Sequence, residues 1–124
     1  MLGTTSINLV LLSTDLTASR AFYADKLQLD VLEESDSAIA YATGGNRITV
    51  TSSTVGTQDE QTKAAWRVDD LRAQLDWLKT RGVEPENYDS DELKTVDGIA
   101  DRGTVWSAWI IDPDGNALGI EQPK

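Results

Sequence analysis

The order of apolar and polar positions in the first half of the chain predicts one strand, one helix and then three strands. Residues 5–12 alternate as a strand does, and residues 13–27 have helical spacing, with Ser13, Thr14 or Asp15 as the N-cap. The extended segments that follow are 29–35, 37–43 and, after a Gly44-Gly45-Asn46 turn, 47–53. The predicted order is therefore β-α-β-β-β.

The same order returns after a polar linker at residues 54–62, which has no periodicity. Residues 63–68 are typical of a strand, and residues 69–82 of a helix that begins at Asp69 or Asp70 and ends at Gly82. The remaining strands are predicted at 83–89, 104–111 and 116–122, with an irregular acidic loop between Asp89 and Asp101.

An internal repeat supports this organisation. A shift of 55 residues places Asp15-Leu16, Ala18, Phe22 and Lys26 on Asp70-Leu71, Ala73, Trp77 and Arg81. A shift of 70 residues places Gly45-Asn46, Ile48 and Val50 on Gly115-Asn116, Leu118 and Ile120. We therefore predict an α+β fold in which one domain, residues 1–124, contains two tandem βαβββ units at about 1–53 and 63–124.

Alternation also assigns each strand residue to a side of its sheet, because the helix must cover the apolar side. The residues expected under the helices include Ile7, Leu9, Leu11, Ile48, Val50, Ala64, Trp66 and Val68, and Trp77 is expected in the core. The opposite side is polar and includes Asn8, Arg47, Thr49, Thr51, Lys63, Arg67 and Glu121. Such a face either binds a ligand or is the solvated side of an ordinary sheet.

Charge and composition limit the partners. The chain has 11 basic and 21 acidic residues and a formal net charge of −10, which disfavours nucleic acid and an anionic membrane surface as partners. Arg47, Lys63 and Arg67 nevertheless gather on the polar face, so we expect a small polar or anionic ligand there. No apolar run approaches the roughly 18 residues of a membrane span, and no basic leader precedes the first strand, so we expect a soluble, cytoplasmic protein.

The absence of two residue types restricts the chemistry further. Without Cys or His, the chain has no thiol or imidazole nucleophile, no disulfide and no metal site built on sulfur or ring nitrogen. Any catalysis would depend on carboxylates, Lys, Tyr or hydroxyl groups.

Several motifs together resemble one known family. The repeated βαβββ order, "DLTASRAFYADKLQLDVL" (15–32), "VDDLRAQLDWLKTRGV" (68–83) and "DPDGN" (112–116) are similar to the vicinal oxygen chelate superfamily, also called glyoxalase/bleomycin resistance/dioxygenase proteins. The resemblance covers nearly the whole chain. It implies two units related by a pseudo-twofold axis, whose curled mixed sheet encloses a cleft with the helices outside.

The resemblance also implies where a metal would bind in metal-dependent members. The matching positions are Asn8 and Lys63 on the first strands and Thr49 and Gly119 on the last strands, and they make a poor ligand set. We therefore expect no metal and no cofactor, as in bleomycin-resistance-type binding proteins, which are often homodimers. The alternatives are a metal-assisted lyase, isomerase or dioxygenase that uses Asn8, Glu121 and water, and a dimeric interaction module with a closed cleft.

Aromatic residues and Glu121 complete the candidate site. Trp106 and Trp109 alternate along one strand, so only one of them should face the cleft, and we favour Trp109, with Tyr41 and Tyr88 as further walls. Glu121 either pairs with Lys63 or Arg67 or accepts a hydrogen bond from the ligand, or it is simply a solvated charge.

Overall fold

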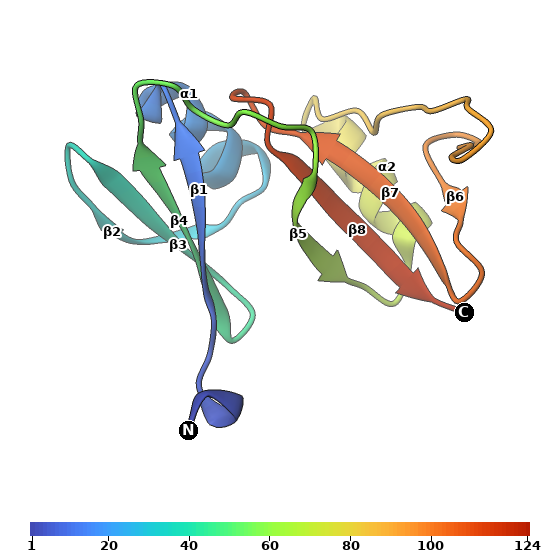
Figure 1. The fold of residues 1–124 in the computed structure, drawn as a ribbon, viewed down its shortest axis with the longest axis horizontal. Coiled ribbons are helices and arrows are strands. Elements are labelled where there is room, and N and C mark those ends of the chain that lie inside the picture. Colours follow the sequence, from blue (N-terminus) through green and yellow to red (C-terminus); the bar gives the residue numbers. More distant parts are fainter. The chain divides into compact units, whose positions relative to one another are not determined.

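The structure is a computed structural model that describes residues 1–124 and divides them into two units, Met1–Asp59 and Glu60–Lys124. We call them unit 1 and unit 2. Each has a four-stranded sheet and a helix, in the order strand, helix, three strands, as the sequence pattern predicts (Figure 1). The α+β class and the two similar halves are thereby confirmed. None of the helices has the length and apolar character needed to cross a bilayer.

Unit 1 has the strand order β1-β4-β3-β2, in which β1 is parallel to β4 and the other pairs are antiparallel. Its elements are η1 (Leu2–Thr4), β1 (Asn8–Ser13), α1 (Leu16–Arg20), the π-helical segment η2 (Ala21–Lys26), β2 (Asp30–Glu34), β3 (Ala38–Thr43) and β4 (Asn46–Ser52). Asp15 is the N-cap of α1, because its carboxylate accepts hydrogen bonds from the amides of Thr17 and Ala18.

The helix of unit 1 differs from the continuous α-helix predicted for 13–27. After Arg20 the turn widens, and the Leu27 amide donates to the carbonyl of Phe22, five residues earlier. The wider turn buries the consecutive residues Phe22 and Tyr23 together, with their ring centroids 5.0 Å apart. Tyr23 in turn contacts Tyr41 on β3 at 5.4 Å between ring centroids.

Tyr41 is therefore a core residue of unit 1 and not the wall of a binding site. Its register partner on β4 is Ile48, on the side of the sheet that α1 and η2 cover, and its side chain is fully buried. The prediction failed because "SAIAYAT" contains small apolar residues on both faces, so its alternation gives no clear side for the tyrosine. Burial raises the pKa of Tyr41 to about 12.

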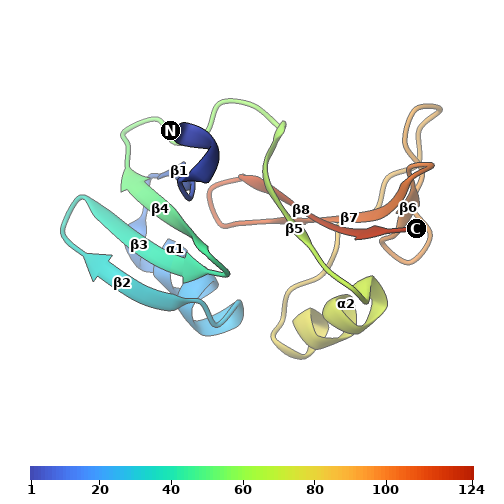
Figure 2. The same cartoon turned by 90° about the horizontal axis from the view of Figure 1, so that it is seen from below.

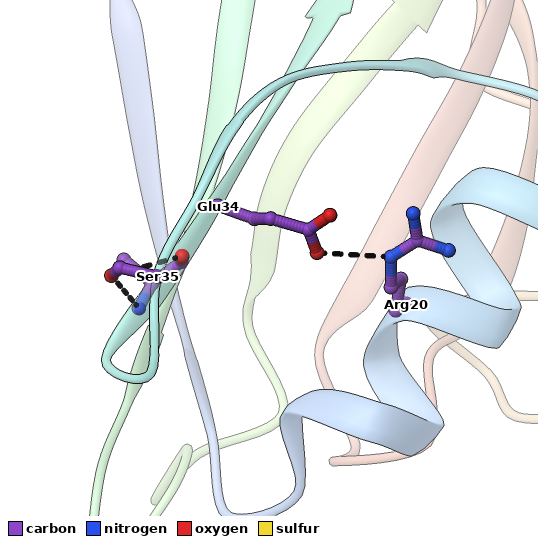
Figure 3. Close-up of polar contacts among 4 residues, drawn as sticks. Arg20, Glu34 and Ser35 are labelled. Atoms are coloured by element: carbon purple, nitrogen blue, oxygen red, sulfur yellow. Dashed lines mark hydrogen bonds and ion pairs between the residues drawn. The ribbon is translucent and has the colours of Figure 1, made fainter.

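An exposed ion pair connects α1 to β2, the edge strand of unit 1 (Figure 3). Arg20 Nε on α1 lies 3.1 Å from Glu34 Oε2 on β2, and this hydrogen bond raises the pKa of Arg20. The neighbouring Ser35 closes the turn into β3, because its hydroxyl oxygen accepts from the amides of Ser37 and Ala38.

Unit 2 repeats this plan with the order β5-β8-β7-β6, in which β5 is parallel to β8. Its elements are β5 (Thr62–Arg67), α2 (Leu71–Thr80), β6 (Ala100–Asp101), β7 (Val105–Ile111) and β8 (Ala117–Pro123). Helix α2 lies along one face of the sheet (Figure 2) and buries Leu71, Leu75 and Leu78 there. The sheet residues buried on this side are Ala108, Ile110, Leu118 and Ile120.

Three predictions about elements and core residues were wrong. Residues 83–89 form no strand, since Pro85 lacks an amide hydrogen; the edge strand is Ala100–Asp101 instead. Ile7 is 63% exposed because β1 begins only at Asn8. Trp77 is 38% exposed although it matches the buried Phe22 in the repeat, because α2 buries only its leucine stripe. Trp66 is half-buried.

Candidate functional site

The sheet of unit 2 has a second face, opposite α2, which we call the far face. Register across β5, β8 and β7 arranges this face in three rows, each with one residue from each strand. The rows are Thr62–Ala117–Ile111, Ala65–Gly119–Trp109 and Arg67–Glu121–Ser107. The first two rows consist of small, hydroxyl and apolar residues, whereas the third row carries a guanidinium, a carboxylate and a hydroxyl.

A β-bulge at Lys63 changes which residue of β5 belongs to the far face. The register of β5 against β8 shifts between Thr62 and Ala64, so Thr62 lies opposite Ala117, the place that the predicted alternation gives to Lys63, whereas Ala65 lies opposite Gly119 as that alternation predicts. A methyl group built on Gly119 would lie 3.3 Å from Cβ of Ala65 and 3.5 Å from Cγ2 of Thr62. The face assignment by simple alternation therefore fails at Lys63, because an extra residue inverts it locally.

Trp109 lies across the middle of the far face. Its indole Nε1 donates a hydrogen bond of 3.1 Å to the Thr62 hydroxyl. Trp109 is on β7 and Thr62 on β5, and β8 runs between them, so the two backbones are about 10 Å apart and the indole must span β8. The missing side chain of Gly119 and the short one of Ala117 leave room for this crossing. The prediction that Trp109 takes the polar face, opposite Trp106, agrees with the register.

Two further side chains surround the indole. Tyr88 meets it edge-on, with ring centroids 5.6 Å apart, and the Arg102 guanidinium carbon lies over the indole at 5.8 Å from its centroid. The pKa of Tyr88 is raised, first by burial and then by the negative charges of Glu86 and Glu60. Tyr88 thus stays neutral, and Arg102 supplies a positive charge beside an otherwise uncharged ring.

Beside the indole lies an open hollow of about 350 Å³ that is formed by unit 2 alone. Its lining includes Thr62, Ala65, Arg102, Ser107, Trp109 and Glu121. Glu121 lies in register between Arg67 and Ser107, so its carboxylate is on the predicted face and beside a predicted cation. Lys63 does not line the hollow.

The far face of unit 1 is built differently. Its predicted polar residues make contacts within the unit: Thr49 donates a 2.8 Å hydrogen bond to Asn8 Oδ1, and Arg47 Nη1 lies 3.8 Å from Glu33 Oε2. Thr51 lies half-buried, in register with Leu12 and Ala38. A second hollow of about 340 Å³ lies near Asn8 and Arg47, at the end of the sheet beside the Gly44-Gly45 turn.

Sequence reasoning missed Thr62, Arg102 and Ser107. Thr62 was assigned to the linker, and only the bulge brings it beside Gly119. Arg102 lies between β6 and β7 in a loop that has no periodicity. Ser107 could have been found, because it shares the alternation of "TVWSAW" with Trp109.

Comparison with known proteins agrees with this architecture. The sequence model of the Glyoxalase/Bleomycin resistance protein/Dioxygenase superfamily matches residues 6–120. The chain belongs to this superfamily. A comparison with curated protein sequences gives no match.

Solved structures show the same fold at low sequence identity. A glyoxalase family protein from Enterococcus faecalis has a TM-score of 0.73 at 18% identity, covering 98% of this chain and 99% of its own. TnmS3, an antibiotic binding protein from Streptomyces sp. CB03234, has a TM-score of 0.69 at 18% identity, covering 98% and 97%. Lactoylglutathione lyase from Agrobacterium tumefaciens has a TM-score of 0.67 at 18% identity, covering 96% and 93%.

The residues at the superfamily's metal positions do not fit a divalent cation. Asn8 and Thr49 hydrogen-bond to each other, which occupies the amide oxygen that would otherwise be a ligand. Gly119 offers no donor atom, and a longer side chain there would press on Ala65. No group of three or more acidic side chains that could hold a metal gathers anywhere in the described chain. We derive no chemistry through a metal ion.

Proposed function

We propose that this protein binds a small polar or anionic molecule, without a metal ion, on the far face of unit 2. The observation that carries the proposal is the Trp109 indole, which Thr62 holds across β8 with Arg102 beside it. Large aromatic side chains held in this way provide contact area at a low cost in conformational entropy, and nearby cations attract an anionic group. A hollow of about 350 Å³ has the volume of a small-molecule site.

The charges around the hollow support the polar or anionic character of the ligand. Arg102 lines the hollow and Arg67 lies on the far face beside Glu121, while Glu86 and Glu60 lie near Tyr88. Two guanidinium groups thus lie at this face in a chain of net charge −10, and they attract an anionic group. Arg47, the cation predicted on the face of unit 1, contributes less because Glu33 already pairs with it.

The superfamily supports binding as a function in its own right. One structure with this fold is named as an antibiotic binding protein, and the poor metal-ligand set of this chain suits sequestration better than Lewis-acid catalysis. The proposal includes, from the same resemblance, a homodimer in the cytoplasm. Light scattering after gel filtration tests the dimer: a mass equal to one chain at all concentrations would contradict it.

A ligand-observed NMR screen of polar and anionic metabolites tests the proposal. We expect compounds whose Kd is the same with excess EDTA and with added Mg²⁺ or Zn²⁺, and which shift one of the four Trp indole N–H signals, that of Trp109. Trp109→Phe should weaken those compounds, whereas Trp106→Phe, on the same strand but the other face, should not. The proposal is wrong if no compound binds saturably, or if binding requires the added metal.

A further inference from the structure

The shape of the far face of unit 2 narrows the class of ligand, provided that the proposed binding function holds. We infer that the ligand is a flat conjugated ring system that carries an acidic group. The ring stacks on the Trp109 indole in the hollow, and the acidic group pairs with Arg102. Three features of the far face support this inference: the flat indole of Trp109, the short side chains in its row, and the position of the Arg102 guanidinium.

The support is flat because it is an indole ring, which the hydrogen bond to Thr62 holds in place. An indole on β7 that donates to a hydroxyl on β5 crosses one intervening strand, so its long axis runs over β8. The indole lines the hollow beside Gly119 and Ala65, so a ligand in the hollow meets a flat aromatic ring. A second planar ring stacks well on such a face, since offset stacking is a favoured geometry for two aromatic rings.

The side chains next to the indole in its row are short. On its own row the other two residues are Gly119 and Ala65, so nothing taller than a methyl group rises from β8 and β5 there. A planar molecule wider than the indole can therefore extend over this row. The bulge keeps a long side chain away from this row, because it puts Thr62 and not Lys63 opposite Ala117.

The Arg102 guanidinium lies close enough to the indole to pair with an acidic group on a ring that stacks there. The Arg102 guanidinium carbon is 5.8 Å from the indole centroid, near the outer limit of about 6 Å for a cation over an aromatic face. Its side chain is exposed and long, so it can move aside and meet an acidic group at the edge of the stacked ring. One row away, Arg67 and Ser107 can donate hydrogen bonds, and Glu121 repels a second negative charge.

Three matched probes separate shape from charge. 2-Naphthoate is flat and anionic, 2-naphthamide is flat and neutral, and decalin-2-carboxylate is anionic but puckered. We expect the wild-type protein to bind 2-naphthoate about tenfold more tightly than either of the other two, as measured by titration calorimetry. Added salt should weaken the binding of 2-naphthoate and leave the binding of 2-naphthamide nearly unchanged.

Single substitutions test which side chains bind the probes. Arg102→Gln should reduce the preference for 2-naphthoate over 2-naphthamide to about twofold or less. Thr62→Val should weaken the binding of both flat probes, because it removes the hydrogen bond that holds the indole. Trp109→Phe should weaken them more than Trp106→Phe, the matched change on the opposite face. Circular dichroism of every variant establishes that it is folded, and none of these residues lies in the core.

Equal binding of decalin-2-carboxylate and 2-naphthoate would overturn the inference, as would the same losses from Trp106→Phe as from Trp109→Phe. Binding of screened aliphatic anions at Trp109, with no binding of the flat probes, would also overturn it and yet leave the proposed function intact. Failure of every screened compound and every probe would instead refute the proposed function itself.

Discussion

The far faces of the two units differ most at their central rows. In unit 1 the row is Val10–Thr49–Ala40, and in unit 2 it is Ala65–Gly119–Trp109. The backbone pairing is the same in both, but the branched side chains of unit 1 stand on the first two strands, while unit 2 has its one large side chain on the third. Two copies of one scaffold can therefore present different surfaces, because the order of large and small side chains along a single row differs.

The largest effect is expected when Gly119 of unit 2 is replaced by threonine, the residue at the matching position of unit 1. We expect Gly119→Thr to displace the Trp109 indole, because its Cβ alone would lie 3.5 Å from Cγ2 of Thr62, whose hydroxyl holds the indole, and its further atoms would crowd that residue. Binding of 2-naphthoate should fall by about tenfold or more, and the indole N–H signal of Trp109 should move toward its position in a free peptide. An unchanged signal would show that the glycine is not needed for the crossing.

The reverse change, Thr49→Gly, is the matched control. It should cost about 1 kcal/mol of stability, since glycine is unfavourable in a strand, and it removes the hydrogen bond to Asn8. Binding of 2-naphthoate should stay as in the wild type.

The cores of the two units offer a second contrast, in their response to alkali. Tyr41 takes the place in unit 1 that Ile110 takes in unit 2, each opposite the equivalent residues Ile48 and Leu118. The unfolded tyrosine loses its proton near pH 10, whereas burial raises the folded pKa to about 12. The unfolded chain therefore binds fewer protons between these values, and stability falls as pH rises from about 10 to 12.

We expect Tyr41→Phe to remove most of this fall, because phenylalanine cannot ionise in either state. Urea unfolding at pH 7, 10 and 11.5 measures it as a smaller loss of unfolding free energy than in the wild type. Tyr88→Phe, whose pKa is raised by a smaller amount in a half-buried setting, should change the alkaline loss less. An equal alkaline loss in Tyr41→Phe and wild type would contradict the assignment.

The smallest expected difference concerns the two helix caps that the repeat aligns. Asp15 accepts from two backbone amides at 3.1 Å, and Asp70 from one at 3.0 Å. Each change to alanine should cost about 1 kcal/mol of unfolding free energy, with Asp15→Ala the larger of the two. Urea titrations at pH 7 measure both, and a larger loss from Asp70→Ala would show that the number of accepted bonds does not control the capping energy.

Much of the fold could be predicted from local patterns. The leucines of α2, the capping aspartates and the strand 116–122 follow rules that act within a few residues, and the structure agrees with them. The turn at Asp112 is likewise held by local hydrogen bonds: its carboxylate accepts from the amides of Asp114 and Asn116 and from the Asn116 side chain. The failures at Tyr41, Trp77 and Lys63 all depend on what packs against a residue from elsewhere in the chain.

The candidate site divides in the same way. The two-unit plan and the place of Trp109, Gly119 and Glu121 on one face follow from period-two alternation and turn chemistry, which are local properties, and the motifs alone carry the resemblance to the superfamily. Only the tertiary structure decided that Thr62 and not Lys63 stands beside Gly119, that the indole crosses β8 and that Arg102 meets it. A bulge, a cross-strand hydrogen bond and a loop contact each join residues that are distant in sequence, and no local pattern encodes such pairings.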